Sequence, residues 1–301
     1  MARAQLGSVE IEWTETGEGD RPLVLLIAGM GAQLTMWPAE LCETVAQAGY
    51  RVVCFDNRDV GLSSGFEHAA PAAALRAAFG GKAPLPIAYG VADMAADALG
   101  LMDALGASRA HLVGMSMGGV IAQRIAIDHP RRVVSFVQIA STTGEPHLPG
   151  ADARIQAFFA GAGEEAPERS AAIERAMEFL RLLAAPAYAR KDEELRAAAT
   201  RDYDRNQHPE GALRQMVAVM TEPPRGAALA NVTAPTLVIH GTEDLMVPLA
   251  GGEDTAARIP GARFERVEGM GHSVEPALAA HLARSIVAHL QAVDGASAAA
   301  R

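Results

Sequence analysis

The chain has 301 residues, of which 50% are hydrophobic and 21% are charged, and its formal net charge is −10. This length and composition predict one large globular domain, or one domain with an insertion. The acidic balance argues against binding to nucleic acid or to an anionic membrane surface. We find no apolar run long enough to span a bilayer and no apolar segment of a signal peptide, so we predict a cytoplasmic protein without membrane insertion.

Short apolar runs alternate with helical patterns through the first 140 residues. The run at 9–13 alternates apolar and polar residues, as a half-buried edge strand does, whereas the run at 23–28 is uniformly apolar, as a strand covered on both faces is. Further strands are predicted at 51–56, 110–114 and 133–140, and helices at 40–49, 91–105 and 118–129. Such alternation predicts an open, mostly parallel sheet with helices on both faces. Residues 61–90, rich in Gly and Pro, are predicted to form a loop with at most one short helix.

The alternation stops near Thr142 and resumes near residue 234. The intervening residues, 144–228, have helical patterns throughout. Strands are then predicted at 234–241 and 263–269, and helices near 250–259 and 275–292, before a frayed tail, GASAAAR. We therefore predict a core made of residues 1–143 and 229–301, with 144–228 inserted as a helical cap between two strands of its sheet.

Ser116 lies in the stretch HLVGMSMGGV, between a predicted strand and a predicted helix. A sharp turn there strains the serine backbone and crowds the positions two residues away, which Gly114 and Gly118 would relieve. The serine side chain would stand at the carboxyl edge of the sheet, where open α/β sheets bind ligands. The pattern favours a nucleophilic serine, and the alternative is a serine that merely caps the helix.

A serine nucleophile requires a base, and the base requires a carboxylate that orients it. In this architecture the acid follows the serine along the chain and the histidine comes last. The stretch LVIHGTEDLMVP places Glu243 and Asp244 just after a late strand, and VEGMGHSVE places His272 after the last one. We predict that His272 is the base. His111 and His240 lie within predicted strands and are interpreted as buried core residues.

The loop IAGMGAQ, after the strand at 23–28, is the candidate for the rest of an oxyanion hole. Gly29 and Gly31 would let its backbone approach a ligand closely, unless the loop is simply a flexible turn. We predict that the backbone N–H groups of Met30 and Met117 hold the oxyanion. Five methionines on or beside these loops also predict a soft, apolar pocket wall, although each could instead fill a gap in the core: Met30, Met115, Met117, Met246 and Met270.

These segments together resemble the α/β-hydrolase superfamily over about residues 8–141 and 229–292. The turn FDNRDVGLSS matches the D-x-R-x-x-G-x-S turn after the fourth strand of this family. With GMGAQLTMWP, the chain looks most like the serine esterase branch that includes the anthracycline methyl esterases. The resemblance implies an eight-stranded, mostly parallel sheet and a helical cap. Two departures are that Ala28 replaces the usual His of the oxyanion loop and Asp59 replaces a Gly common in the fourth-strand turn.

The resemblance also implies a Ser116–Asp244–His272 hydrolase that works through an acyl-enzyme and needs no metal or organic cofactor. A Pro four residues after the acid is the family spacing, which selects Asp244 over the solvent-facing Glu243. Ser116 argues against epoxide hydrolases and dehalogenases, which use Asp as nucleophile. A carbon–carbon bond hydrolase or a cofactor-free perhydrolase could keep the same triad, and a ligand receptor on a hydrolase fold is a third alternative.

The negative charge and the lack of a basic cluster in the catalytic loops predict a neutral small-molecule substrate. We predict carboxylic esters with short to medium acyl chains, because a helical cap limits the length of the pocket. The cap is expected to add apolar residues to the pocket wall: Phe158, Phe159, Phe179, Leu182, Leu183 and Met216.

Overall fold

The computed structural model describes residues 1–17, 19–70, 73–75, 81, 84–160, 168–206, 208 and 210–299. In this part of the chain eight strands form one sheet, in the order β1-β2-β4-β3-β5-β6-β7-β8. The strands are β1 (Ala2–Leu6), β2 (Val9–Thr16), β3 (Leu23–Ile27), β4 (Arg51–Phe55), β5 (Ala110–Met115), β6 (Val133–Ile139), β7 (Thr236–Gly241) and β8 (Arg263–Val267). β1, β2 and β4 pair antiparallel, and every pairing from β4 to β8 is parallel. The predicted fold class is therefore confirmed.

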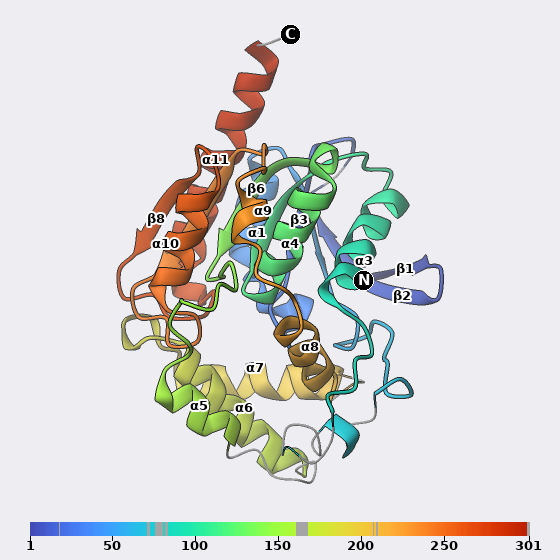
Figure 1. The fold of residues 1–301 in the computed structure, drawn as a ribbon, viewed down its shortest axis with the longest axis vertical. Helices are drawn as coiled ribbons and strands as arrows, with labels where there is room; N and C mark the ends of the chain where they lie inside the picture. The colour runs from blue at the N-terminus through green and yellow to red at the C-terminus, as the bar shows by residue number, and fades with distance from the viewer. Residues whose placement is uncertain are drawn as a thin grey trace.

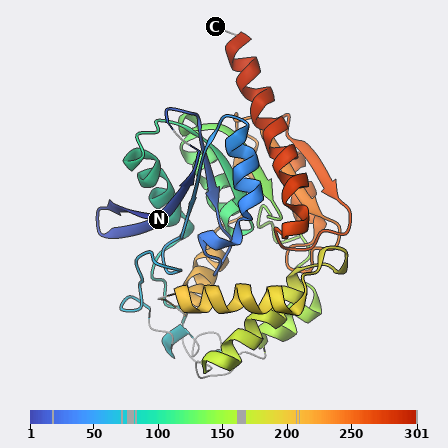
Figure 2. The same cartoon turned by 180° about the vertical axis from the view of Figure 1, so that it is seen from behind.

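Helices cover both faces of the sheet. Figure 1 shows α3 (Val91–Ala104), α4 (Met117–Asp128), α9 (Gly226–Leu229) and α10 (Leu249–Arg258) on the near face. Figure 2 shows α1 (Ala39–Gln47) and α11 (Ala279–Ala299) on the opposite face. Short 3₁₀ helices lie at Leu34–Met36, Pro130–Arg132, Pro186–Tyr188 and Pro276–Leu278. The helices hide the sheet from solvent on both sides, which a largely parallel sheet requires.

The uniformly apolar sequence of β3 follows from this layering. Successive side chains of a strand point to opposite faces. Leu25 and Ile27 pack into the core beneath α3 and α4, whereas Val24 and Leu26 pack into the core beneath α1 and α11. Because both faces are covered, all five residues of β3 are buried. The carboxyl ends of the parallel strands β3, β5, β7 and β8 consequently lie at one edge of this buried sheet.

A helical insertion follows β6. Its helices are α5 (Ala153–Ala160), α6 (Arg169–Leu183), α7 (Asp192–Arg205) and α8 (Gly211–Met220). α6 and α7 pack through a small core of their own, which is made of Ile173, Met177, Leu195 and Ala199. Figure 1 shows α5, α6 and α7 gathered beyond one end of the sheet, with α8 between them and the core. The division of the chain at residues 144 and 228 stays a prediction.

Two predictions about the ends of the chain were wrong. The strand predicted at 9–13 is not the edge of the sheet, because β2 pairs with β1 on one side and with β4 on the other. The predicted frayed tail is helical through Ala299, since α11 continues into a run rich in alanine, the strongest helix former. Figure 2 shows this end of α11 projecting away from the body.

The predicted loop at 61–90 lies partly outside the described residues. The described part consists of turns, irregular segments and a helical turn at 73–75. Among the helices that the structure describes, none combines the length and apolarity needed to cross a bilayer.

Candidate active site

Ser116 occupies a strained turn between β5 and α4. Its backbone has φ 53° and ψ −120°, a conformation that residues other than glycine rarely adopt. A Cβ at Gly114 would collide with the carbonyl of Gly118, and a Cβ at Gly118 would collide with the carbonyl of Ile27. Close backbone packing thus explains both glycines that flank the serine. The crowding at Gly114 lies within the turn, as the sequence pattern predicted, whereas Gly118 makes room for β3.

The surrounding structure holds this turn in place. The N–H of Ser116 donates to the carbonyl of Ile139 at 2.9 Å, and the Ser116 carbonyl accepts from the Ser141 hydroxyl at 2.8 Å. Both partners belong to β6 or to the residues just after it. The neighbouring strand therefore fixes the strained backbone, so that Oγ stands above the carboxyl edge of the sheet.

The structure brings Ser116, His272 and Asp244 into one chain of hydrogen bonds. His272 Nε2 lies 2.9 Å from Ser116 Oγ, and His272 Nδ1 lies 2.8 Å from Asp244 Oδ2. The three side chains come from the loops after β5, β8 and β7. Ser116 lies 156 residues before His272, and Asp244 lies 28 residues before it. The three side chains meet at one edge because β5, β7 and β8 are parallel strands close together in the sheet, with only β6 between β5 and β7.

Asp244 is buried and held on both oxygens. Oδ1 accepts the N–H groups of Met246 and Val247 at 2.9 and 2.8 Å, which leaves Oδ2 for His272. Burial alone would raise the pKa of this carboxyl, but the adjacent His272 and His240 side chains outweigh that effect and hold the pKa well below its usual range. Asp244 is therefore ionised near neutral pH. Glu243, the other candidate, is exposed.

The insertion also contacts the loop that carries His272. The N–H of His272 donates to the carbonyl of Leu183, at the end of α6, at 2.8 Å. A Cβ at Gly271 would collide with that same carbonyl, so only glycine permits this approach. The candidate base is thus oriented by Asp244 from the core and by α6 from the insertion.

His240 contributes to the site in a way that sequence reasoning missed. It is fully buried in β7, as predicted for a core residue. However, its Nε2 lies 2.8 Å from the carbonyl of Val247 and 3.4 Å from Asp244 Oδ2. The side chain therefore supports the loop that presents Asp244. The only sequence signal is the spacing of four residues between His240 and Asp244, which has no meaning until the turn between them is known.

The loop after β3 forms a tight turn beside Ser116. The carbonyl of Gly29 accepts the N–H of Ala32 at 3.2 Å, and Gly31 has φ +69°, two features of a type II turn. A Cβ at Gly29 would lie 3.3 Å from the Ser116 Cβ. The turn carrying Met30 and the first helical residue of α4, Met117, therefore flank the serine from two sides.

A cavity of about 640 Å³ opens onto the serine and histidine side chains. The core contributes Met30, Met115, Met246 and Trp37 to its wall, and α6 contributes Phe179, Leu180 and Leu183.

The predicted methionine wall is thus only partly correct, since Met117 and Met270 are buried in the two sheet cores instead. Of the six predicted cap residues, Phe179 and Leu183 line this cavity, whereas the prediction was wrong for Phe158, Phe159, Leu182 and Met216. Phe158 stacks on Phe179, and Phe159 meets both of these rings edge-on.

Two arginines of the insertion also line the cavity, and both face carboxylates. Arg190 donates to Glu275 through two nitrogens, at 2.5 and 3.3 Å, and Arg201 donates to Asp202 at 2.9 Å. Asp202 also accepts the hydroxyl of Thr35 at 2.8 Å. Because each positive charge is matched by a carboxylate, these arginines do not form a free clamp for an anionic substrate.

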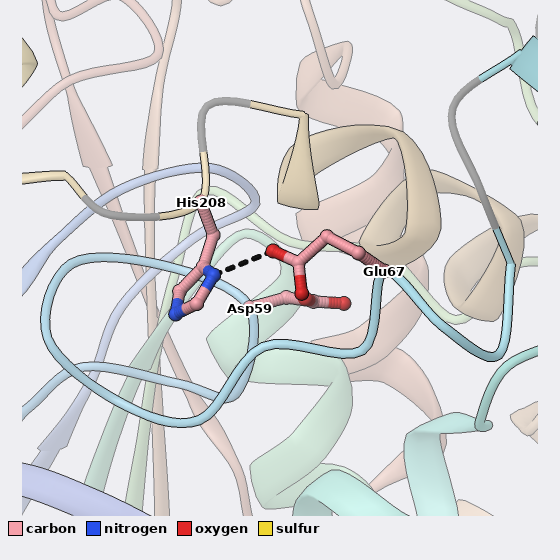
Figure 3. A group of neighbouring side chains, drawn as sticks. All are labelled: Asp59, Glu67 and His208. Atoms are coloured by element: carbon pink, nitrogen blue, oxygen red, sulfur yellow. Dashed lines mark hydrogen bonds and ion pairs between the residues drawn. The ribbon is translucent and has the colours of Figure 1, made fainter.

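A second group of titratable side chains lies at the turn after β4. Ligand atoms of Asp59, Glu67 and His208 lie within 4.8 Å of one another, a spacing that a metal ion could use (Figure 3). The donor set does not fit a metal, because Arg214 donates to both oxygens of Asp59 at 2.8 and 3.0 Å. The two nitrogens of His208 face Glu67 and the carbonyl of Ser63. The cluster instead ties the insertion to the core.

This arrangement explains one departure from the family pattern. Asp59 has φ +70°, the left-handed conformation in which glycine is usual, and its carboxylate also accepts the Tyr89 hydroxyl and the Phe66 N–H. The residue that replaces glycine therefore keeps the turn and adds an anchor for α8.

With the geometry established, comparisons with known proteins define the family. Residues 22–274 match the family model for the alpha/beta hydrolase fold, and the chain belongs to this family. It is 32% identical to rhodomycin D methylesterase DauP of Streptomyces sp. (strain C5), over 93% of this chain and 95% of that protein. This similarity confirms the predicted resemblance to anthracycline methyl esterases.

More distant relatives catalyse other hydrolyses. The chain is 28% identical to a 2-hydroxy-6-oxononadienedioate/2-hydroxy-6-oxononatrienedioate hydrolase of Burkholderia vietnamiensis, over 88% of this chain and 85% of that protein. Among solved structures, the enol-lactonase from Burkholderia xenovorans LB400 superposes with a TM-score of 0.74 at 23% identity, over 96% of this chain and all of that one. The likeness to the enol-lactonase shows the fold alone, whereas the curated relatives support hydrolase activity and the methylesterase supports an ester hydrolase.

Proposed function

We propose that this protein is a serine esterase that cleaves neutral carboxylic esters through an acyl-enzyme on Ser116. The observation that carries the proposal is the hydrogen-bonded chain from Ser116 through His272 to Asp244, at the floor of a mainly apolar cavity. Such a chain supplies the nucleophile, the base and the orienting carboxylate that ester hydrolysis by serine requires.

In the first half-reaction, Ser116 Oγ attacks the acyl carbonyl while its proton passes to His272 Nε2. Asp244 keeps the proton of His272 on Nδ1, so that Nε2 is free to act as the base. The N–H groups of Met30 and Met117 stabilise the negative charge that develops on the carbonyl oxygen. When the tetrahedral intermediate collapses, the C–O bond to the alcohol breaks and His272 returns the proton to the departing alcohol.

In the second half-reaction, a water molecule attacks the acyl group on Ser116. His272 accepts a proton from the water and then gives it to Ser116 Oγ as the acid leaves. The protein therefore returns to its starting protonation state without a redox or metal-assisted step.

The cavity wall supports a neutral, mainly apolar substrate. Methionine, leucine and aromatic side chains surround the space beyond Ser116, and the two arginines that line it face carboxylates. Each methylene that the substrate buries against this wall contributes about 0.8 kcal/mol. We therefore expect kcat/KM to rise with acyl length until the chain reaches the end of the cavity, and then to fall.

Three measurements test the proposal. A fluorophosphonate should label the wild-type protein stoichiometrically at Ser116, and Ser116→Ala should lower kcat by several orders of magnitude while the circular dichroism spectrum is unchanged. A series of p-nitrophenyl esters from acetate to palmitate, assayed below their aggregation limits, should show its maximum at short to medium chains. Near-normal turnover by folded Ser116→Ala would refute the proposal, and a maximum at palmitate would indicate a lipase.

Carbon–carbon bond hydrolysis is the second candidate, favoured by the relative from Burkholderia vietnamiensis. The dioate named for that relative carries two carboxylates, whereas Arg190 and Arg201 of this chain are already paired. Cleavage of a vinylogous diketone without turnover of any ester would favour this alternative.

A further inference from the structure

Gln215 joins the helical insertion to the turn that carries Met30. It lies in α8 and is fully buried. Its Oε1 accepts the N–H of Gly31 at 2.7 Å, and its Nε2 donates to the carbonyl of Arg58 at 2.8 Å. The Gly31 N–H can only donate a hydrogen bond, and the Arg58 carbonyl can only accept one. The two partners therefore fix which way the amide points.

The hydrogen bond to Gln215 holds the central peptide of the 29–32 turn. The carbonyl of Gly29 faces into the turn, where it accepts the N–H of Ala32. The described peptide bonds are trans, so the N–H of Met30 points opposite to that carbonyl and away from the turn. The next peptide, between Met30 and Gly31, distinguishes a type II turn from a type I turn by its orientation. Gln215 binds the N–H of that peptide.

α8 is itself held rigidly against the core. Arg214, the neighbour of Gln215, makes a bidentate ion pair with Asp59, and both side chains are at most 1% exposed. At the start of the helix, a Cβ at Gly211 would collide with the carbonyl of Asp59. Gln215 therefore has a fixed position from which to hold the turn.

We propose that Gln215 is a positioning residue for the oxyanion hole: it holds the 29–32 turn in the conformation that directs the Met30 N–H at the tetrahedral intermediate. This inference rests on the proposed function. Its consequence is that the insertion, besides covering the cavity, completes the charge-stabilising part of the site.

The variant Gln215→Met tests this role, because methionine matches the length of glutamine but makes neither hydrogen bond. We expect kcat for a p-nitrophenyl ester to fall about 10- to 100-fold, since a misplaced donor loses much of its value, with KM changed less than about threefold. An alkyl trifluoromethyl ketone forms a covalent hemiketal with Ser116 Oγ and places an oxyanion in the hole, the proton going to His272. Its affinity should weaken by the same factor as kcat.

Thr255→Val is the matched control for a purely structural effect. Thr255 is fully buried in α10, donates to the carbonyl of Gly251 and accepts from Gln138. Its loss should lower the melting temperature while leaving kcat per titrated serine and ketone affinity unchanged. Comparing the two variants separates lost stability from lost oxyanion stabilisation.

Gln215→Glu supplies a second readout if Gln215→Met fails to fold. A protonated glutamic acid accepts from Gly31 and donates to Arg58, as glutamine does, whereas the ionised form cannot donate. The activity of Gln215→Glu relative to wild type should therefore rise as the pH falls from 8 to 6. A merely structural residue would change the amount of folded protein with pH but would leave the ratio of kcat per titrated serine independent of pH.

The outcomes distinguish this inference from the proposed function. If fluorophosphonate labels Ser116 but both Gln215 variants keep kcat and ketone affinity within twofold of wild type at every pH, the positioning role is refuted. If Ser116 is neither labelled nor needed for turnover, the proposed function fails and the inference falls with it.

Discussion

Replacing Asp244 by asparagine should trap His272 in a form that cannot act as a base. The N–H groups of Met246 and Val247 both point at Asp244 Oδ1. In Asp244→Asn the amide oxygen must stay with these two donors, so its NH₂ group faces His272 Nδ1. That nitrogen must then accept a hydrogen bond, which places the ring proton on Nε2, facing Ser116 Oγ. The base position is thereby occupied before the reaction starts.

The expected loss in kcat is on the order of 10⁴, or about 5 kcal/mol of transition-state stabilisation, by analogy with the same change in another serine hydrolase fold. The assay is kcat on p-nitrophenyl butyrate, normalised to the serine that fluorophosphonate labels, with circular dichroism to verify folding. KM should change little, because Asp244 orients the base and does not bind the acyl group.

Glu243→Gln is the matched control. This variant removes the carboxylate of an exposed side chain, that of the residue next to Asp244, and should change kcat less than about twofold. If Asp244→Asn retains more than a tenth of wild-type kcat, or if Glu243→Gln is the more damaging change, the reasoning about the tautomer is refuted.

Two further predictions concern the oxyanion donor and acid stability. Met30→Ala should alter KM and acyl preference more than kcat, because Met30 acts through its N–H; a loss of about 10²–10³ in kcat with an intact turn would place the donor elsewhere. Burial lowers the pKa of His289 to about 4 from 6.5, so the folded protein resists protonation there. The unfolded chain binds more protons between these values, so the free energy of unfolding should decrease as the pH falls from 6.5 to 4, by about 1–2 kcal/mol at pH 5 after allowing for solvent screening. His289→Gln, which keeps a donor for the carbonyl of Pro235, should show a shallower decrease in urea titrations; an identical pH dependence would contradict this.

Much of the core was predictable because its signals are local. A run such as β3 is apolar at every position, and this pattern arises in a parallel strand covered on both faces. Gly114 is needed because a Cβ there would collide with Gly118 in the same turn, so the signal of this glycine is local, whereas Gly118 is needed because of Ile27 in β3. Asp244 and His272 could be proposed because each follows a late strand, and the order of such strands along the chain matches a known family.

The edge of the sheet was harder to predict from the sequence, because no local pattern distinguishes an edge strand from its neighbour. β2 alternates apolar and polar residues although it is paired on both sides. The extra strand, β1, is short and has only one buried residue, so its hydrophobic signal is weak. Likewise, the alanine-rich sequence at the end of α11 is equally compatible with an irregular tail and with a helix.

By itself, the sequence determined the identity and order of the catalytic candidates, since the motif around Ser116 and the loops with Asp244 and His272 each carry their own chemical signature. Only the tertiary structure decided how the insertion serves them. α6 orients His272 through the Leu183 carbonyl, and α8 holds the turn of Met30 through Gln215. These contacts join residues 89 and 184 positions apart and involve backbone groups. A backbone carbonyl or N–H is present at almost every residue, so no sequence pattern marks the ones that the fold brings together.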